Sequence, residues 1–504
     1  MLSKLKENFN IIKEFSINLA VDHPRKVFGI GLSTIACGIF FNHYLWRKKM
    51  PPMINYTFPF FGDLSLFSNF FLNDFAGFLI EKGKTLNSDV VASYMFGQPF
   101  IFILGYDKFY KCMIDKGHET SGRVIQGEID KELLDIRRGV FSSEGNVWHA
   151  HRQLIVRALK DLGLGTTRLY DDVNDEARLL IEELKKLPQD DSTDLLKVFQ
   201  VSSGSIISQM IFGHRIEDLN MLRDMFDTNA EAAEAYRKFD IKRYIPGIQS
   251  DLDKILEKTF RKCVNFIKSE IYIHEANRAE ANDLISMILQ KQEVQPDLYT
   301  IRDIVAIVID LFRAGTGTTA STLLWAIYHL RNNKNIQEEI RHEIDLTIGG
   351  KSLEISDIEK LPKLSAFISE TLRFTPIIKE GVPHRALKSF NLDGITIPKG
   401  ACIMAVQHAI LKDPKYWKAP NEFNINNFLN KDRSEYVPHY QHSVEFGMGP
   451  RRCPGDKLAR IELYIFLIAI LQNFYILSLE DASKFKEENA FGFLSDIAVK
   501  FVEI

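Results

Sequence analysis

The feature that most constrains this chain is the stretch Phe446–Gly455, with the sequence FGMGPRRCPG, which runs directly into an apolar-periodic segment over Asp456–Gln472. The periodicity predicts a helix, so Cys453 would stand at a helix start, where the helix dipole and free N–H groups favour a thiolate. The glycines let the backbone approach a flat ligand closely and direct N–H groups at the sulfur. The stretch therefore predicts a thiolate ligand site; the alternative is a buried structural cysteine beside a glycine turn.

The composition narrows the class of protein. The 504 residues include 5 cysteines, which are far apart and form no CxxC pair. They predict neither a disulfide framework nor a zinc cluster, and they indicate a reducing compartment. Lys and Arg number 63 against 66 Asp and Glu, a net charge of −3, which disfavours a nucleic-acid binder. The 37 phenylalanines suit a large apolar interior or pocket.

An uncharged, mostly apolar segment lies near the N-terminus, over Val27–Leu45. Three basic residues at 47–49 and the pair Pro51-Pro52 follow it, which predicts a membrane anchor and a stiff spacer. The alternative is a buried core helix, because the strongly apolar part is shorter than the roughly 20 residues that cross a bilayer. We therefore divide the chain into an N-terminal segment (1–26), a membrane anchor helix (27–46), a basic and proline-containing hinge (47–56) and one large domain (57–504).

Helical patterns dominate the large domain, and strand signals are fewer. We predict helices over Arg178–Leu187, Asp251–Glu275, Thr300–Arg331 and Asn335–Thr347. Phe390–Leu392 and Ile395–Ile397 flank Asp393-Gly394, a strong hairpin signal, and β-prone residues recur over Phe474–Leu479 and Ile497–Val502. Because no linker or repeat follows Pro52, the sequence predicts a single, mainly α domain with a minor antiparallel β part.

Two further motifs lie on helical segments. Glu370 and Arg373 stand at i and i+3, on one helix face, and can form an ion pair. Ala314–Thr319, with the sequence AGTGTT, lies inside the long helix, where each glycine costs about 1 kcal/mol relative to alanine. Thr318 can hydrogen-bond to a carbonyl one turn earlier, and together these residues would open the helix locally. A phosphate cradle does not fit, because the P-loop lysine is absent and the segment is mid-helix.

These motifs carry a resemblance to a known family. The cysteine stretch matches F-x-x-G-x-R-x-C-x-G, Glu370–Arg373 matches E-x-x-R, and Trp148–Arg152 matches W-x-x-x-R. In these residues the chain resembles the cytochrome P450 haem-thiolate monooxygenases, and its anchor and hinge are similar to those of the microsomal members. The stretch Gly139–Ser142, the W-x-x-x-R helix and the pair Pro383-His384 resemble most of all the drug- and steroid-hydroxylating clan. The resemblance covers nearly all residues after Pro52 and implies the cytochrome P450 fold, one large domain behind an N-terminal transmembrane anchor.

The resemblance also implies a set of site residues. Cys453 would be the axial thiolate ligand of the iron of haem b, and Thr318 the catalytic residue that delivers protons. The Glu370–Arg373 pair would support the cysteine loop. The other residues implied to bind the haem are Arg451, Trp148, Arg152, His384, Phe446, Gly449, Gly455, Ala314 and Gly315. The candidate substrate contacts are Phe312, Ile377, Ile378, Phe491 and Phe493, each of which has a core position as its alternative.

The chain departs from the family pattern at two positions. Gly317 stands where the family usually has Asp or Glu before the threonine, so proton supply would need water or another group. Asn427 stands where the family often supplies an arginine to the Glu370–Arg373 pair. Gly317 gives weight to an alternative function, a reductase-independent haem-thiolate isomerase, dehydratase or peroxygenase. A haem-binding or membrane scaffold protein without catalysis is a third hypothesis.

By resemblance, the chain is expected to insert one oxygen atom from O2 into a lipophilic substrate, such as a steroid, a fatty acid or a xenobiotic. Electrons would come from NADPH through NADPH-cytochrome reductase, with cytochrome b5 as a further partner. Arg452, Lys457 and Arg460 could dock the reductase or form a solvated basic face. The expected location is the endoplasmic reticulum membrane, single-pass, with the catalytic domain in the cytosol; the alternative is mitochondrial. The sequence does not name the substrate, because apolar pockets discriminate through shape.

Overall fold

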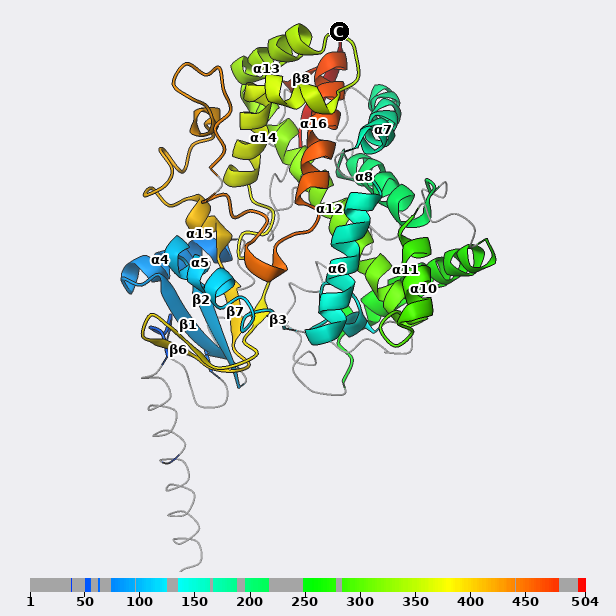
Figure 1. Ribbon diagram of the computed structural model, residues 1–504. Coiled ribbons are helices and arrows are strands. Elements are labelled where there is room, and N and C mark those ends of the chain that lie inside the picture. The colour runs from blue at the N-terminus through cyan, green and yellow to red at the C-terminus, as the bar shows by residue number, and fades with distance from the viewer. Residues whose placement is uncertain are drawn as a thin grey trace, which may run out of the picture.

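Figure 1 shows the computed structural model of the chain. The structure describes residues 38, 50–55, 62–63, 74–95, 97–124, 135–163, 166–187, 195–216, 248–277, 283–439, 441–479 and 497–504. Apart from Gly38, the expected anchor helix 27–46 lies outside the described residues, and so do the candidate substrate contacts Phe491 and Phe493.

Long helices form most of the body. They are α6 (Gly145–Asp161), α7 (Thr167–Lys185), α8 (Leu195–Phe212), α10 (Asp251–Ala276), α11 (Leu284–Val294), α12 (Ile301–Asn332), α13 (Lys334–Thr347), α14 (Pro362–Phe374) and α16 (Asp456–Asn473). A further helix is α4 (Phe75–Thr85), and two short ones are α5 (Tyr106–Tyr110) and α15 (Gln407–Leu411). The helices predicted over Asp251–Glu275, Thr300–Arg331 and Asn335–Thr347 are confirmed as α10, α12 and α13, and Arg178–Leu187 falls mostly within α7.

The longest helix, α12, runs through the centre of the body and packs against α8, α10, α14 and α16 (Figure 1). It begins with a capping box, in which the side chain of Thr300 accepts from the N–H of Asp303 and the Asp303 carboxylate accepts from the N–H of Thr300. Because other helices surround α12, residues along its length such as Ile307 and Ala320 are fully buried. By length and composition α8 and α12 could each cross a membrane, but most of each is buried, as in the core helices of a soluble body.

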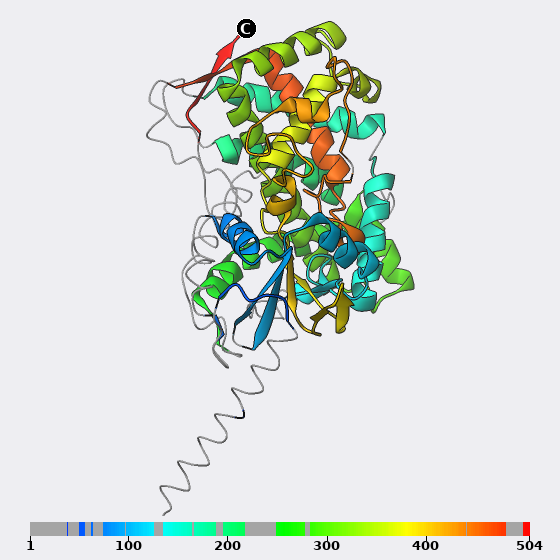
Figure 2. The same cartoon turned by 90° about the vertical axis from the view of Figure 1, so that its left-hand side faces the viewer.

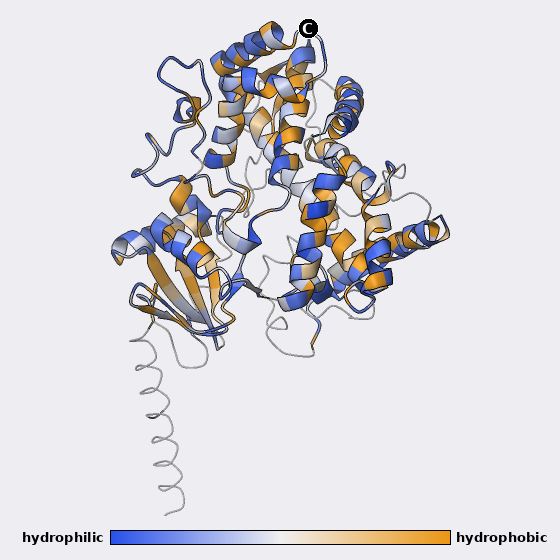
Figure 3. Cartoon of the chain, in the orientation of Figure 1, coloured by the Kyte–Doolittle hydropathy of each residue, from blue (hydrophilic) through white to orange (hydrophobic). Residues whose placement is uncertain are grey.

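The largest sheet is mixed. Its strand order is β1 (Val90–Met95), β2 (Gln98–Ile103), β7 (Cys402–Ala405), β4 (His384–Arg385) and β3 (Gly122–Arg123). β2 and β7 are parallel, with Phe100 opposite Cys402, and the other neighbours are antiparallel. The expectation of an antiparallel β part holds for three of these four strand pairs and is wrong for β2–β7, because strands so far apart in the sequence leave no local pairing signal. Figures 1 and 2 show the sheet at one end of the body, near α4, α5 and α15, and Figure 3 shows hydrophobic colouring along much of β1 and β2.

Two smaller sheets follow the sequence closely. β5 (Phe390–Leu392) and β6 (Ile395–Ile397) form the predicted hairpin, with Asp393 and Gly394 at φ of 50° and 89° in the turn. β8 (Phe474–Ser478) pairs with β9 (Val499–Glu503), which agrees with the β-prone residues noted in both segments. The sequence signal succeeded here because the hairpin is local and its turn residues favour positive φ.

Part of the expected hinge 47–56 packs on the sheet. The N–H of Ile54 donates to Ala92 O at 2.9 Å, and the N–H of Ala92 donates to Pro52 O at 2.8 Å. Ile54 is buried against β1 and α4. These residues therefore extend the edge of β1 and belong to the large domain rather than to a free spacer.

The two glycines of α12 differ in their surroundings. A Cβ on Gly315 would lie 2.5 Å from Cδ1 of Ile207, so glycine allows α8 and α12 to approach closely. A Cβ on Gly317 would meet nothing within 4 Å. The helix is regular from Ile301 to Asn332, so the expected local opening at these glycines is not seen.

His329 is a buried ionisable residue on α12. Its ring stacks on Phe423 with centroids 4.0 Å apart, and Nε2 lies 3.3 Å from Thr375 Oγ1. Burial, and secondly the charge of Lys412, lower the pKa of His329 to about 3. The folded protein therefore holds this imidazole neutral throughout the physiological pH range.

This pKa makes stability depend on pH. Below pH 6.5 the unfolded chain takes up a proton that folded His329 does not, so stability falls on acidification. Between pH 7 and pH 5 this histidine should lower the unfolding free energy of the unmodified chain by roughly 2 kcal/mol. His329→Gln should lack this contribution, so its unfolding free energy, measured by urea unfolding, should fall by that much less over the same pH range. His342→Gln, at an exposed position on α13, is the control and should leave the slope unchanged. Equal slopes for His329→Gln and the unmodified chain would contradict the neutral assignment.

Candidate active site

The loop that carries Cys453 is closed by its own backbone. The N–H of Cys453 donates to Phe446 O at 2.9 Å, and the N–H of Arg452 donates to Gly449 O at 3.1 Å. Gly447 and Gly449 both have φ of 72°, and a Cβ on Gly449 would overlap the carbonyl oxygen of Met113. Glycine at 449 is thus required both by backbone conformation and by close packing.

One cavity brings this loop and α12 together. Its volume is about 130 Å³, and its lining includes the expected haem contacts Phe446, Gly455, Ala314 and Gly315, together with Cys453 and Thr318. Apolar side chains from α6, α8 and α16 complete the walls, such as Leu159, Ile211 and Leu458. A cavity with apolar walls and a few polar groups is typical of a small-molecule or cofactor site.

The surroundings of Cys453 do not by themselves produce a thiolate. Burial raises the pKa of the Cys453 thiol, and the N–H of Gly455 and the guanidinium of Arg152 only partly offset it. This differs from the expectation that the helix start would favour the thiolate, because desolvation outweighs the local dipoles. A metal ion that binds the sulfur would deprotonate it outright.

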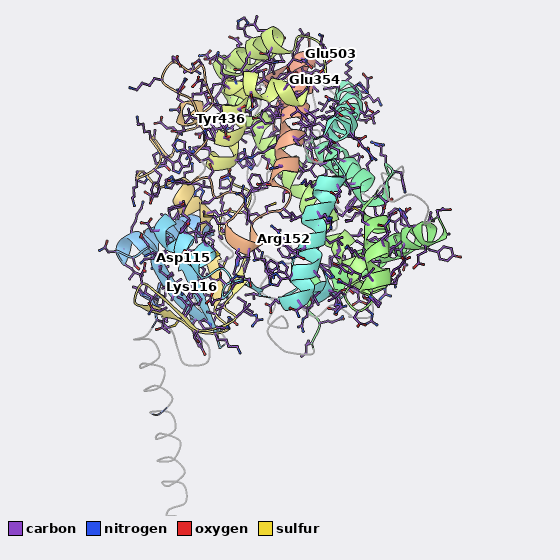
Figure 4. The ribbon with its side chains drawn as sticks, viewed as in Figure 1. Asp115, Lys116, Arg152, Glu354, Tyr436 and Glu503 are labelled. Carbon is purple, nitrogen blue, oxygen red and sulfur yellow. The ribbon has the colours of Figure 1, made fainter. Side chains whose placement is uncertain are left out.

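Basic side chains gather beside the same loop. Arg451 lies over the ring of Trp148 at 4.0 Å and donates to Ser121 O at 2.8 Å. Arg152, on α6, donates to Arg452 O, and its charge acts on Cys453. Figure 4 labels Arg152 between α6 and the cysteine loop. Burial, and secondly Arg123, lower the pKa of Arg451 to about 9, which shows how closely these cations crowd one another.

Arg123 belongs to this cluster, although no sequence motif had pointed to it. It stands on β3 opposite His384 on β4, and its guanidinium donates to Phe141 O and Pro383 O. Burial and Arg152 lower the pKa of Arg123 to about 10. No usable signal for Arg123 was present in the sequence, because β3 consists of only Gly122 and Arg123 and is too short to show a strand pattern.

The cluster fits an anionic group. In the part of the chain that the structure describes, Arg123, Arg152 and Arg451 donate to backbone carbonyls and pair with no carboxylate. The nearby Glu144 accepts from the N–H of Arg123 and pairs with Arg385. His384 donates from Nδ1 to Thr120 O at 2.7 Å, and burial and Arg123 lower its pKa to about 3. Two carboxylates such as haem propionates would relieve this concentration of positive charge.

Glu370 and Arg373 form a fully buried ion pair. Nε and Nη2 of Arg373 each donate to a different oxygen of Glu370, both at 2.7 Å. Nη1 of Arg373 donates to Leu411 O at 2.7 Å and to Pro420 O at 3.1 Å. The pair thus ties α14 to the segment that leads toward the cysteine loop, with both side chains at most 1% exposed.

Asn427 contacts the pair as an uncharged third member. Its Nδ2 lies 3.3 Å from both oxygens of Glu370, and the N–H of Asn424 donates to Oε1 at 2.8 Å. Lys412 adds positive charge nearby, and burial followed by Arg373 lowers its pKa to about 7. The replacement of the usual arginine therefore leaves the carboxylate fully hydrogen-bonded.

Thr318 faces the cavity with its hydroxyl engaged. Oγ1 donates to Ala314 O at 2.6 Å, the backbone contact expected from the sequence. The three described substrate candidates lie elsewhere: Phe312 is buried in a separate small space with Phe212 and Cys263, and neither Ile377 nor the exposed Ile378 lines the Cys453 cavity. The apolar pattern around them did not distinguish a pocket wall from the core.

The buried ion pair leads to a stability prediction. Arg373→Met would leave the Glu370 carboxylate buried without a cation, which costs about 3–5 kcal/mol of unfolding free energy. Arg178→Met, which breaks an exposed i, i+3 pair with Asp175 on α7, should change it by less than about 0.5 kcal/mol. Urea unfolding of the two variants checks this, and similar small losses in both would contradict the role given to the buried pair.

The comparisons with known proteins agree with this geometry. The family model for cytochrome P450 matches residues 51–498. Cytochrome P450 2L1 of Panulirus argus is 31% identical over 356 residues, 67% of this chain and 72% of that protein. Cytochrome P450 2H1 of Gallus gallus is 30% identical over 397 residues, 76% of this chain and 79% of that protein. Cytochrome P450 2C8 of Homo sapiens is 30% identical over 415 residues, 78% of this chain and 82% of that protein. The chain therefore belongs to the cytochrome P450 family of monooxygenases.

Proposed function

We propose that this chain inserts one oxygen atom of O2 into a lipophilic substrate, with Cys453 as the ligand of a haem b iron. The observation that carries the proposal is the single cavity lined by Cys453 on one side and by Ala314 and Thr318 on the other. The arginines beside the cysteine loop suit the two propionates of the haem. Haem bound there would supply the activation of O2 and the transfer of oxygen.

In this proposal the residues of the chain bind and orient the haem and shield the cavity from water. Arg123, Arg152 and Arg451 would bind the haem propionates, and Gly455, where a Cβ would lie 4.0 Å from Cys453 Sγ, leaves room beside the sulfur. Apolar side chains of α6 and α8 exclude water from the cavity. Thr318 Oγ1 donates a hydrogen bond to Ala314 O, and this hydroxyl would pass a proton into the cavity.

The partners and the location follow from the family. Electrons would come from NADPH through NADPH-cytochrome reductase, with cytochrome b5 as a further donor. Of the expected docking residues, Arg452 pairs with Asp456 at 2.6 Å and Arg460 with Glu445 at 2.8 Å, whereas Lys457 is exposed. An anchor at 27–46 would hold the enzyme on the endoplasmic reticulum membrane with its catalytic domain, 57–504, in the cytosol.

A test of this function begins with the haem ligand. The reduced protein with carbon monoxide should show the red-shifted Soret band of thiolate ligation, and Cys453→His should lose it. Cys402→Ala, which removes another buried thiol on β7, is the control and should keep the band. Product formation from a substrate found in a lipid, steroid and xenobiotic panel should require NADPH and reductase. Turnover that is independent of both would favour the isomerase, dehydratase or peroxygenase alternative.

Gly317 gives a second prediction. Nothing lies within 4 Å of a Cβ at this position, which directly precedes Thr318, so a longer side chain fits there without displacing its neighbours. We expect Gly317→Glu to raise the amount of product per NADPH consumed several-fold, because a carboxyl group can relay protons beside Thr318. Gly317→Gln, of equal size but without an ionisable proton, should not. Equal coupling in both variants would mean that proton supply does not limit this enzyme.

A further inference from the structure

Glu462 is a buried acid on α16, in the wall of the Cys453 cavity. The residue is 1% exposed. Of the described residues in the cavity wall, only Glu462 carries a carboxyl group, and the other polar side chains there are Cys453, Thr318 and Thr319. A polar group is costly to bury in an otherwise apolar wall, so apolar packing alone does not account for this residue.

The surroundings hold Glu462 in its protonated form. Burial raises the pKa of Glu462 well above its ordinary value, and the hydroxyl of Ser203 offsets only part of this rise. Among the residues that the structure describes, no cation acts on the carboxyl group to restore its charge. At neutral pH the group therefore carries a proton that it can donate.

This carboxyl group has an oxygen that no neighbour satisfies. Oε2 of Glu462 is fully enclosed and lacks a hydrogen-bond partner among the described residues, and the same is true of Oγ of Ser203 on α8. The two groups influence each other without a direct hydrogen bond, which is the arrangement that a bridging water molecule completes. Buried polar atoms left without a partner are rare in native proteins and often have a catalytic role.

Polar groups continue from Ser203 toward the surface. Burial raises the pKa of Glu176 on α7, and the guanidinium of Arg215 partly offsets this rise. The hydroxyls of Ser205 and Ser202, on α8 beside Ser203, act on Glu176 in the same direction as Arg215. Nε of Arg215 donates to Glu176 at 3.0 Å, and its side chain is 33% exposed. Hydroxyl and ionisable groups thus extend from the cavity across α8 to a place that solvent reaches.

The cavity needs such a source of protons. Insertion of one atom of O2 into a substrate consumes two electrons and two protons, and the other oxygen atom leaves as water. Thr318 Oγ1 donates its own proton to Ala314 O, so it can pass a proton onward only if another group supplies one. The neighbouring Gly317 has no side chain that could do so.

We propose that Glu462 is the acid that supplies protons to the Cys453 cavity, in place of the carboxyl group that position 317 lacks. The O–H bond of the carboxyl group breaks, the electron pair stays on the carboxylate, and the proton passes through water and Thr318 Oγ1 to the oxygen atom that leaves as water. A proton from the side of α7 then returns to Glu462 by way of Ser203. The inference rests on the proposed function, in which NADPH supplies the electrons through the reductase, and it assigns the source of the protons.

Glu462→Gln tests this role, because it keeps the size of the side chain and removes the ionisable proton. We expect the haem-loaded full chain to lose about 10-fold in product per NADPH consumed, less than the full contribution of a general acid, because water still supplies protons slowly. Ser203→Ala should lose part of the same quantity. Glu343→Gln, which changes a partly buried carboxyl group on α13 that accepts from the N–H of Lys363, is the control and should lose none.

An acid at position 317 separates proton supply from a structural effect. Added to Glu462→Gln, Gly317→Glu should restore the product per NADPH, whereas Gly317→Gln should not. A defect of packing on α16 would not be repaired by an acid on α12. Unchanged product per NADPH in Glu462→Gln, or a loss that Gly317→Glu does not repair, would overturn the proposal. If Glu462→Gln does not fold, Ser203→Ala combined with the same two substitutions decides the matter.

Infrared spectroscopy checks the protonated group without turnover. At about pH 8, where ordinary carboxyl groups are ionised, the unmodified chain should show the C=O band of a protonated carboxyl group, shifted in D2O, that Glu462→Gln lacks. Identical carboxyl bands in the two proteins would overturn the assignment. Absence of the thiolate-type carbon monoxide band from the unmodified chain would instead overturn the haem-thiolate function, and the infrared band would still report on Glu462.

Discussion

The ion pair between Glu370 and Arg373 is the interaction on which the rest of the site depends. Arg373 joins α14 to carbonyls of residues 411, 420 and 422, and Glu370 gathers the N–H of Asn424 and the amide of Asn427. These contacts fix the chain that leads to the Cys453 loop, where the described helical elements are only the short 3-10 turns Ile425–Phe428 and Gly449–Arg451. Since both charges are buried, neither side chain can move without leaving the other unpaired.

Electrostatics inside the body contrast with the near-neutral chain, whose net charge is −3. In one place, beside the Cys453 loop, Arg123, Arg152 and Arg451 donate to backbone carbonyls and pair with no carboxylate among the described residues. This cluster suits a cofactor with two carboxylates. The body thus offers a site for an anion, although the composition as a whole shows no excess of positive charge.

The sequence predicted what is local and missed what is formed across long distances. The β5–β6 hairpin, the helix ends of α10, α12 and α13, and the closeness of Glu370 to Arg373 all follow from neighbouring residues. The parallel β2–β7 pair and the position of Arg123 opposite His384 depend on segments hundreds of residues apart, which no periodicity reveals. The direction of the Cys453 pKa was missed because desolvation depends on the whole packed surroundings rather than on a helix start.

The parallel pairing of Phe100 with Cys402 also bears on how the chain reaches its folded state. The two strands can pair only after a loop of this length has closed, so this sheet is expected to form late and slowly. During synthesis the edge of β2 emerges long before β7, and it stays open to pairing with other chains until most of the protein has been made. Arg123 and His384 lie on strands of this same sheet. Capacity to hold the cofactor should therefore arise among the last events of folding, and truncated chains should lack it.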